Sequence, residues 1–149
     1  MNAPNQQVVD ALQASLAELI DLALLGKQAH WSVVGPQFRS VHLELDEIVD
    51  LARVSYDRVA ERIATLGIAP DGRAETVAST SELPPFPEGF VPATETVQRV
   101  TQSMDTIAMR LKERIAAVGD DDPVSQDILI GTTDEIEKAA WMLRSQLTM

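Results

Sequence analysis

Apolar residues recur every three or four positions through four long segments of this 149-residue chain, and this spacing restricts the fold more than any other feature. Side chains at such spacing fall on one face of an α-helix. The first segment runs from Val8 to about Val34, and His30 continues its apolar stripe. The stripe itself consists of Leu12, Leu16, Leu19 and Ala23. The spacing predicts a long helix with one buried face.

A second helix of about 30 residues is predicted after the break at Gly35-Pro36. Pro36 suits the first position of a helix, where a missing N–H costs nothing. Gly67 should end the helix, because glycine favours the position after the last helical turn. The short connection makes the two helices antiparallel neighbours. The expected core residues are Val41, Leu45, Ile48, Ala52, Val59 and Ile63.

Residues 67–92 are rich in proline and glycine and predict a long connection, interrupted by a short helix around residues 74–80. A third helix should end at Gly119, and a fourth should cover about 123–147, with Asp122 as its N-cap and Pro123 as its first residue. The expected core residues are Val97, Val100, Met104, Ile107, Leu111, Ile115 and Val118 in the third helix, and Ile128, Ile136, Ala140, Leu143 and Leu147 in the fourth. Trp141 is interpreted as a packing residue.

Two short-linked helix pairs joined by one long crossover predict an all-α, ferritin-like four-helix bundle. The length suits one domain covering residues 1–149. The sequence shows neither an internal repeat nor strand-length alternation.

Composition narrows the functions open to such a bundle. The chain contains no cysteine, so any bound metal must have nitrogen and oxygen ligands. The net charge of −11 favours cations over nucleic acid or anionic membranes. Lys27 is the first basic residue and Arg144 the last, so no basic tail is expected to bind DNA, and DNA binding should be weak or absent. No apolar run approaches the roughly 18 residues of a membrane span, and no basic leader is evident, so a cytoplasmic protein is expected.

Five candidate metal ligands lie within 32 residues and include both histidines of the chain: His30, His42, Asp46, Asp57 and Glu61. His42 with Asp46, and Asp57 with Glu61, have the i,i+4 spacing that brings two ligands to one ion. On one continuous helix, however, Asp46 and Asp57 would lie roughly 16 Å apart along the axis, too far for a single ion. The spacing therefore predicts two half-sites.

A two-fold axis near Leu51 would complete both half-sites. Two antiparallel copies of the helix would place Asp57 and Glu61 of one chain beside His42 and Asp46 of the other. Mixed imidazole and carboxylate ligands suit Fe(II), Zn or Mn better than Cu(I) or Ca. The Glu-x-x-His motif of di-iron sites within one bundle is absent, because the residues three positions before the histidines are Lys27 and Arg39.

Each of these residues also has a simpler interpretation. A lone histidine on an apolar face is usually a packed core residue, and Asp57 with Glu61 could be a solvated face near Arg58 and Arg62. Trp31 is by type a core or interface anchor, although beside a redox metal it could supply or intercept an electron. Asp122 is explained by helix capping alone, and Asp127 suits a cation pore only if symmetry gathers several copies.

The run His30-Trp31 through Gly35-Pro36 to Phe38, with the ligands that follow it, resembles the Dps family, the ferritin-like DNA-binding proteins from starved cells. The likeness continues through residues 60–67 and from Ser125-Gln126-Asp127 to Trp141. It implies a hollow dodecamer whose ferroxidase sites lie at two-fold interfaces. The implied ligands are His30, His42 and Asp46 of one subunit and Asp57 and Glu61 of its partner, with Asp122 and Asp127 in acidic three-fold pores.

The resemblance implies a ferroxidase that oxidises Fe(II), preferably with hydrogen peroxide, stores Fe(III) as a mineral and protects against oxidative damage. Two alternatives remain open at this point. One is compaction of the nucleoid through DNA binding, and the other is a structural helical oligomer without redox turnover.

Overall fold

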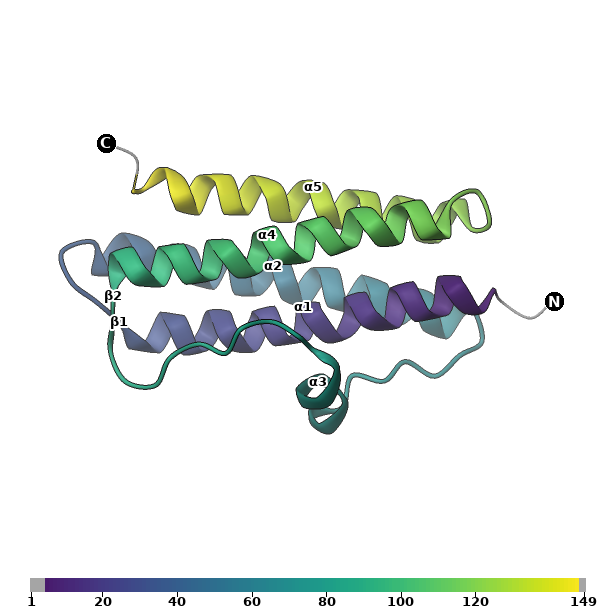
Figure 1. Cartoon of the computed structure of the whole chain (residues 1–149), viewed down its shortest axis with the longest axis horizontal. Helices are drawn as coiled ribbons and strands as arrows, with labels where there is room; N and C mark the ends of the chain where they lie inside the picture. Colours follow the sequence, from purple (N-terminus) through teal and green to yellow (C-terminus); the bar gives the residue numbers. More distant parts are fainter. Residues whose placement is uncertain (1–4, 148–149) are drawn as a thin grey trace.

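The computed structural model describes residues 5–147, and its four long helices form a bundle (Figure 1). The helices are α1 (Gln6–Ser32), α2 (Phe38–Thr65), α4 (Ala93–Val118) and α5 (Pro123–Ser145). Helices α1 and α2 are antiparallel neighbours, and so are α4 and α5 (Figure 1). The long connection returns the chain across the bundle, so α2 and α4 run in the same direction. The predicted all-α four-helix architecture is confirmed.

The crossover contains the short helix α3 (Ala74–Thr80), at the predicted place. Next to the ends of α1 and α4, two short strands pair in parallel: β1 (Val33–Val34) and β2 (Val91–Pro92), with Val33 opposite Val91. The sequence did not predict them, because a two-residue strand is too short to show alternation.

The helix ends mostly follow the predicted signals. Gly67 and Gly119 have φ angles of +83° and +52°, values that favour glycine, and they directly follow the last turns of α2 and α4. The Asp122 side chain caps α5 by accepting a hydrogen bond from the Ser125 N–H, 3.1 Å away. The prediction for Pro36 was wrong, because α2 begins at Phe38. Gly35 (φ +117°) starts a turn in which the Phe38 N–H donates to the Gly35 carbonyl at 3.0 Å, and Pro36 lies within that turn.

The apolar stripes meet in one core between the helices. Most of the predicted residues are buried, and the largest fully buried side chains are Leu12, Leu16, Leu19, Leu22, Leu45, Ile48, Ile63, Met104, Ile107, Leu111, Leu129 and Ile136. In α5, Leu129 is fully buried where Ile128 was predicted, and Ile128 is only partly buried. Trp141 does not pack into the core either, since 62% of it is exposed.

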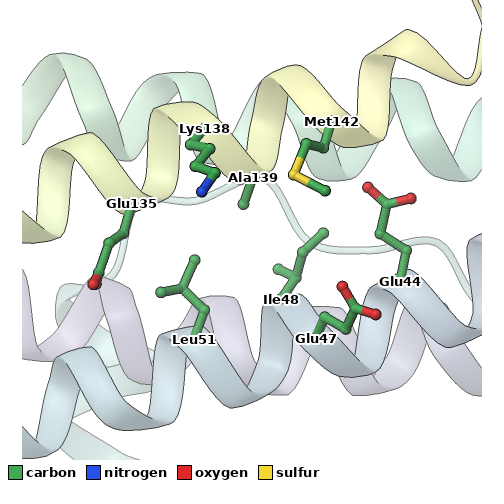
Figure 2. Close-up of a pocket in the computed structure, with 8 residues that line it drawn as sticks. All are labelled: Glu44, Glu47, Ile48, Leu51, Glu135, Lys138, Ala139 and Met142. Atoms are coloured by element: carbon green, nitrogen blue, oxygen red, sulfur yellow. The ribbon is translucent and has the colours of Figure 1, made fainter.

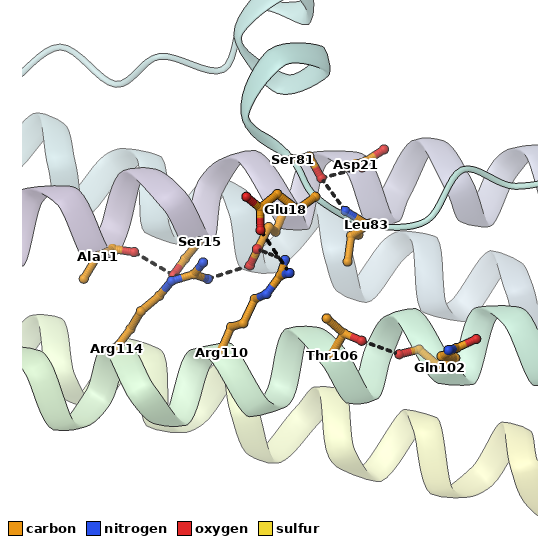
Figure 3. A network of polar contacts seen from close by, with 11 residues as sticks. Ala11, Ser15, Glu18, Asp21, Ser81, Leu83, Gln102, Thr106, Arg110 and Arg114 are labelled. Carbon is orange, nitrogen blue, oxygen red and sulfur yellow. Dashed lines mark hydrogen bonds and ion pairs between the residues drawn. The ribbon is translucent and has the colours of Figure 1, made fainter.

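A buried ion cluster joins α1 to α4 (Figure 3). Glu18 is only 4% exposed, and its two carboxylate oxygens accept hydrogen bonds of 2.6 Å from Arg110 and Arg114. Ser81, at the end of α3, donates to Asp21 of α1 at 2.5 Å and ties the crossover to the bundle (Figure 3). Removing one partner would leave a buried charge uncompensated, so these contacts fix how α1 sits against α4.

None of the helices within residues 5–147 combines the length and the apolarity that crossing a bilayer requires.

Candidate metal centre

The two histidines lie together where α1 ends and α2 begins. Their rings stack with centroids 3.6 Å apart and planes inclined by 20°. His30 Nδ1 lies 2.7 Å from the His42 carbonyl oxygen, and His42 Nδ1 lies 2.8 Å from the His30 carbonyl oxygen. A carbonyl only accepts, so each Nδ1 must carry its proton. In the neutral rings both Nε2 atoms therefore keep a lone pair for a metal ion.

The close approach of α1 to α2 makes this pairing possible. A Cβ at Gly26, one turn before His30, would lie only 2.8 Å from Val49 Cγ2 of α2. Phe38 covers the other side of the His42 ring, with centroids 4.9 Å apart. His30 is 8% exposed, which is typical of a packed residue, but its reciprocal hydrogen bonds also fix the tautomer that a ligand needs. The packed-residue and ligand interpretations are therefore compatible.

Asp46 lies beside this histidine pair. Its Oδ1 atom is 3.4 Å from His30 Nδ1 and forms an ion pair with Lys27 Nζ from α1. The hydrogen bond from Lys27 holds the pKa of Asp46 below its usual range, against the opposing effect of partial burial. Imidazole nitrogens and an ionised carboxylate are ligand types suited to Fe(II). The contact of Asp46 is with the protonated Nδ1 atom of His30, however, and not with its Nε2 atom.

Asp57 and Glu61 are on the same helix but in a different setting. Helix α2 is continuous from Phe38 to Thr65, so about 16 Å of helix axis separates Asp46 from Asp57. Both Asp57 and Glu61 are exposed, and neither makes a hydrogen bond or ion pair with any other residue in the range 5–147. Arg62 does not neutralise them, because it binds Asp122 and Ser125. This pair has the charge and freedom to bind a cation held mainly by another molecule.

The single chain does not assemble a full metal site from these residues. Within residues 5–147 no group of three or more histidine, cysteine, aspartate or glutamate side chains is arranged to hold an ion. The structure brings His30, His42 and Asp46 together and leaves Asp57 and Glu61 apart from them. The assignment of these five residues as ligands stays a prediction, and it requires a second chain.

A separate acidic cleft of about 250 Å³ lies between α2 and α5 (Figure 2). Glu44 and Glu47 of α2 and Glu135 of α5 contribute its carboxylates, and Lys138 extends from α5 beside Glu135 (Figure 2). Burial raises the pKa of Glu44, partly offset by a hydrogen bond from Gln146. The cleft has no histidine in its lining and is on another side of α2, so it adds no ligand to the histidine group.

The two predicted pore residues differ in their surroundings. Asp122 accepts two hydrogen bonds from Arg62 Nη2, at 2.9 and 2.7 Å, and another from Ser125 Oγ at 2.7 Å. Burial alone would raise the pKa of Asp122, but these hydrogen bonds outweigh it and the pKa is lowered. Asp127 is exposed. The capping role of Asp122 is therefore visible in one chain, whereas a pore role for either residue stays a prediction.

Trp31 follows His30 directly and points outward, with 67% of its surface exposed. It lines a hollow of about 240 Å³ with Lys27, Arg53 and Tyr56, among others. Trp31 is therefore not a core anchor in the single chain, and an interface or redox role stays open.

Two neighbours of the site were not predicted. The sequence analysis noted Lys27 as the first basic residue and as the residue that replaces the glutamate of a Glu-x-x-His motif, but it assigned Lys27 no contact. Lys27 pairs with Asp46, and its i,i+3 spacing to His30 was the signal that could have placed it there. Phe38 was part of the motif but had no assigned contact. Its tilted ring contact with His42 depends on the turn at Gly35, which the sequence pattern did not resolve.

Comparisons with known proteins agree with the ferritin-like fold. Residues 9–149 match the family described as the ferritin-like domain. The fine tangled pili major subunit of Haemophilus ducreyi is 37% identical over 97% of this chain and 77% of its own length. The DNA protection during starvation protein of Mycolicibacterium smegmatis is 37% identical over 94% of this chain and 76% of its own length.

Solved structures give the same result. The structure of Dps from Microbacterium arborescens in the high iron form has a TM-score of 0.89 and 30% identity, and the match covers 96% of both chains. The bundle, the single long crossover and the matches along nearly the whole sequence are in agreement. The chain therefore belongs to the Dps family of ferritin-like proteins.

Proposed function

We propose that this chain is the subunit of an iron-storing ferroxidase whose reaction sites form between two subunits. His30, His42 and Asp46 of one subunit would bind Fe(II) together with Asp57 and Glu61 of its partner. The proposal rests on one observation. Helices α1 and α2 carry two separate groups of candidate ligands, and each group is incomplete. One group is held rigidly by reciprocal hydrogen bonds, and the other is exposed and unengaged within the described residues.

Family membership supports the general part of this proposal, because ferritin-like Dps proteins are associated with iron storage and protection from oxidative damage. The relative from M. arborescens is described in a high iron form. Iron is the substrate here, since Fe(II) enters and Fe(III) is stored. Mixed nitrogen and oxygen ligands suit Fe(II), and the lone pairs on both Nε2 atoms are available to it.

The proposed oxidant is hydrogen peroxide. One peroxide molecule takes two electrons and two protons and becomes two water molecules, so two Fe(II) ions become Fe(III) without releasing a hydroxyl radical. The chain's residues would bind the Fe(II) ions and exclude other ligands. Trp31, which is adjacent to His30 and exposed in the single chain, would donate an electron when Fe(II) does not supply it.

The proposed assembly is a hollow dodecamer that encloses the ferric mineral in the cytoplasm. Asp127, and Asp122 behind it, would line acidic three-fold pores where cations enter, because gathered carboxylates concentrate cations. The net charge of −11 per chain supports attraction of Fe(II) to such a shell.

The decisive experiment removes the carboxylate pair. In Asp57→Ala with Glu61→Ala, peroxide-driven Fe(II) oxidation, followed by ferric absorbance, should fall about 100-fold, because the ion loses two of five ligands. The assembly should keep its size in gel filtration. A matched control, Glu113→Ala with Asp134→Ala, removes the same charge from other exposed positions and should oxidise normally. Unchanged oxidation in the first variant would refute the site assignment.

The names of the relatives support a second candidate function, the protection of DNA by direct binding. The strongly negative net charge opposes it. A gel-shift assay of intact assemblies across salt and Mg²⁺ concentrations separates the two functions. A robust, salt-sensitive shift without divalent ions would favour DNA binding.

A further inference from the structure

The cleft between α2 and α5 has carboxylates at both ends and an apolar middle (Figure 2). Glu135 lies at one end, and Glu44 and Glu47 lie at the other (Figure 2). The residues between them are Ile48, Leu51, Ala139 and Met142. None of the lining residues belongs to the histidine group or to the exposed carboxylate pair. The cleft is therefore a second place on α2 where a ligand could bind.

Helix geometry gives the distance between the two ends of the cleft. Glu44 and Leu51 mark the two ends on α2, and seven residues at about 1.5 Å each make this wall about 10 Å long. On α5 the same spacing separates Glu135 from Met142, and Met142 lies across the cleft from Glu44 (Figure 2). Negative groups about 10 Å apart with hydrocarbon between them are complementary to a ligand with two positive ends and an apolar chain.

The polar groups of the cleft are only partly engaged. Gln146 Nε2 donates a hydrogen bond to Glu44 Oε2, whereas Glu44 Oε1 is buried and has no hydrogen-bond partner among residues 5–147. Lys138 forms no ion pair with any residue in that range. A buried acceptor without a donor is costly, so a donor that enters the cleft recovers free energy. Three carboxylates and one ammonium leave the cleft with a net charge of about −2.

We propose that this cleft binds an aliphatic diamine, with one ammonium at Glu135, the other at Glu44 and Glu47, and the hydrocarbon chain on the apolar middle. The two positive charges match the net charge of the cleft. Hydrogen bonds of about 2.8 Å at both ends leave roughly 5 Å between the two nitrogens, which a chain of three or four carbons spans with bonds of about 1.5 Å. The site is separate from the metal centre, and its occupancy does not depend on the proposed function.

A bare divalent cation fits this lining less well. Mg²⁺ and Ca²⁺ each need about six or more oxygen ligands, whereas half of the lining residues are apolar and the Lys138 ammonium repels a metal ion. A chain with a net charge of −11 also attracts every cation to its surface, but salt screens that attraction. Binding in the cleft is therefore distinguished from surface attraction by its dependence on salt, on particular residues and on the carbon chain.

The test is a calorimetric titration of the metal-free, assembled protein with 1,4-diaminobutane in about 0.15 M salt. One molecule should bind per chain. Glu47→Gln with Glu135→Gln should weaken binding at least about tenfold, because each end loses a charge-assisted hydrogen bond. Lys138→Met should strengthen binding about threefold or more, because it removes an ammonium that repels the ligand.

Glu75→Gln with Glu88→Gln is the matched control, because it removes the same charge from exposed positions outside the cleft and should leave binding unchanged. Equal losses of affinity in the two glutamine double variants would overturn the inference. Gel filtration and thermal melting confirm that each variant is assembled and folded, and Glu135→Gln alone replaces the cleft double variant if the latter does not assemble.

Two monoamines test the role of the apolar middle. Butylammonium should bind at least about tenfold more tightly than methylammonium, because each buried methylene contributes about three- to fourfold. Equal affinity of the two would show attraction by charge alone and would contradict the proposed site.

The methyl group of Met142 reports where the diamine binds. In protein labelled with ¹³C at the methionine methyl groups, the NMR signal of Met142 should shift during the titration. The signal of Met109, a similarly exposed methionine on α4, should not move. Met142→Leu assigns the signal by removing it. A Met142 signal that stays in place while the diamine binds would place the ligand elsewhere and refute the inference.

Discussion

Two groups of polar side chains on α2 differ in how many contacts hold them in place. Near its start, His42 and Asp46 are held by stacking, reciprocal hydrogen bonds and an ion pair, all from α1 or the connecting turn. Further along, Asp57 and Glu61 extend into solvent and contact no other side chain through a hydrogen bond or ion pair in the described range. The fold therefore preorganises the first group, whereas no such contact orders the second group within the described residues.

This contrast explains why the single chain looks incomplete as a metal site. Preorganised ligands lose little conformational entropy when they bind an ion. Exposed carboxylates on a helix cost the fold little, but their side chains must be ordered on binding. Placing the two groups three turns apart on one helix means that two-fold symmetry can join them twice in a single interface.

The largest expected effect comes from mixing two inactive proteins. His30→Ala with His42→Ala destroys the histidine group, and Asp57→Ala with Glu61→Ala destroys the carboxylate group. Randomly coassembled shells should recover about one quarter of the sites, because half of the two-fold pairs are mixed and each mixed pair has one intact site. Fe(II) oxidation by the coassembled protein, compared with either variant alone, measures the recovery.

Separately assembled shells that are mixed afterwards provide the control and should stay inactive. Coassembled shells without recovered oxidation would contradict a site shared between subunits.

The next effect concerns stability. In metal-free protein, His42→Ala removes a hydrogen bond and a ring stack and should lower the free energy of unfolding by about 1–2 kcal/mol, which corresponds to a melting temperature about 2–8 °C lower. Asp57→Asn with Glu61→Gln should stay within about 0.5 kcal/mol of the original, because nothing in the chain depends on these charges. Thermal melting at matched protein concentration checks both values. Equal losses in the two variants would remove the distinction between a held group and a free group.

The smallest effect is the pH dependence of stability, which distinguishes a hydrogen-bonded carboxylate from an unpartnered one. The pKa of Asp122 is lowered in the folded chain, so its contribution to stability is complete above the ordinary aspartate pKa and is lost as the pH falls below about 4. Asp122→Asn should therefore destabilise the protein by about 1 kcal/mol at pH 7 and by less at pH 3. Urea unfolding at the two pH values measures this. An identical loss at both would show that the Asp122 charge is not used.

The helices were predictable because their signals are local. Each signal acts within one or two helical turns. The signals are the spacing of residues such as Leu12 and Leu16, the glycines that follow α2 and α4, and the Asp122-Pro123 pair. The errors arose where tertiary contacts decide. Pro36 falls in a turn set by Gly35, and Leu129 replaces Ile128 because the rotation of α5 depends on its packing against α4.

The candidate site divides in the same way. Helix arithmetic alone separated the carboxylate pair from the histidines, since α2 is continuous as assumed. The reciprocal hydrogen bonds of His30 and His42 and the ion pair of Lys27 could not be predicted, because they depend on how closely two helices approach at Gly26.

The reciprocal hydrogen bonds of His30 and His42 also affect the stage of folding and assembly at which iron oxidation can begin. His30 and His42 are twelve residues apart and meet across one turn, a local contact of the kind that forms early in folding. In the proposed site, the carboxylates would join them only when two finished subunits meet, a step that depends on protein concentration. A newly synthesised subunit would therefore bind iron weakly and oxidise little of it. Fe(III) would then form only where an assembled shell is already present to store it.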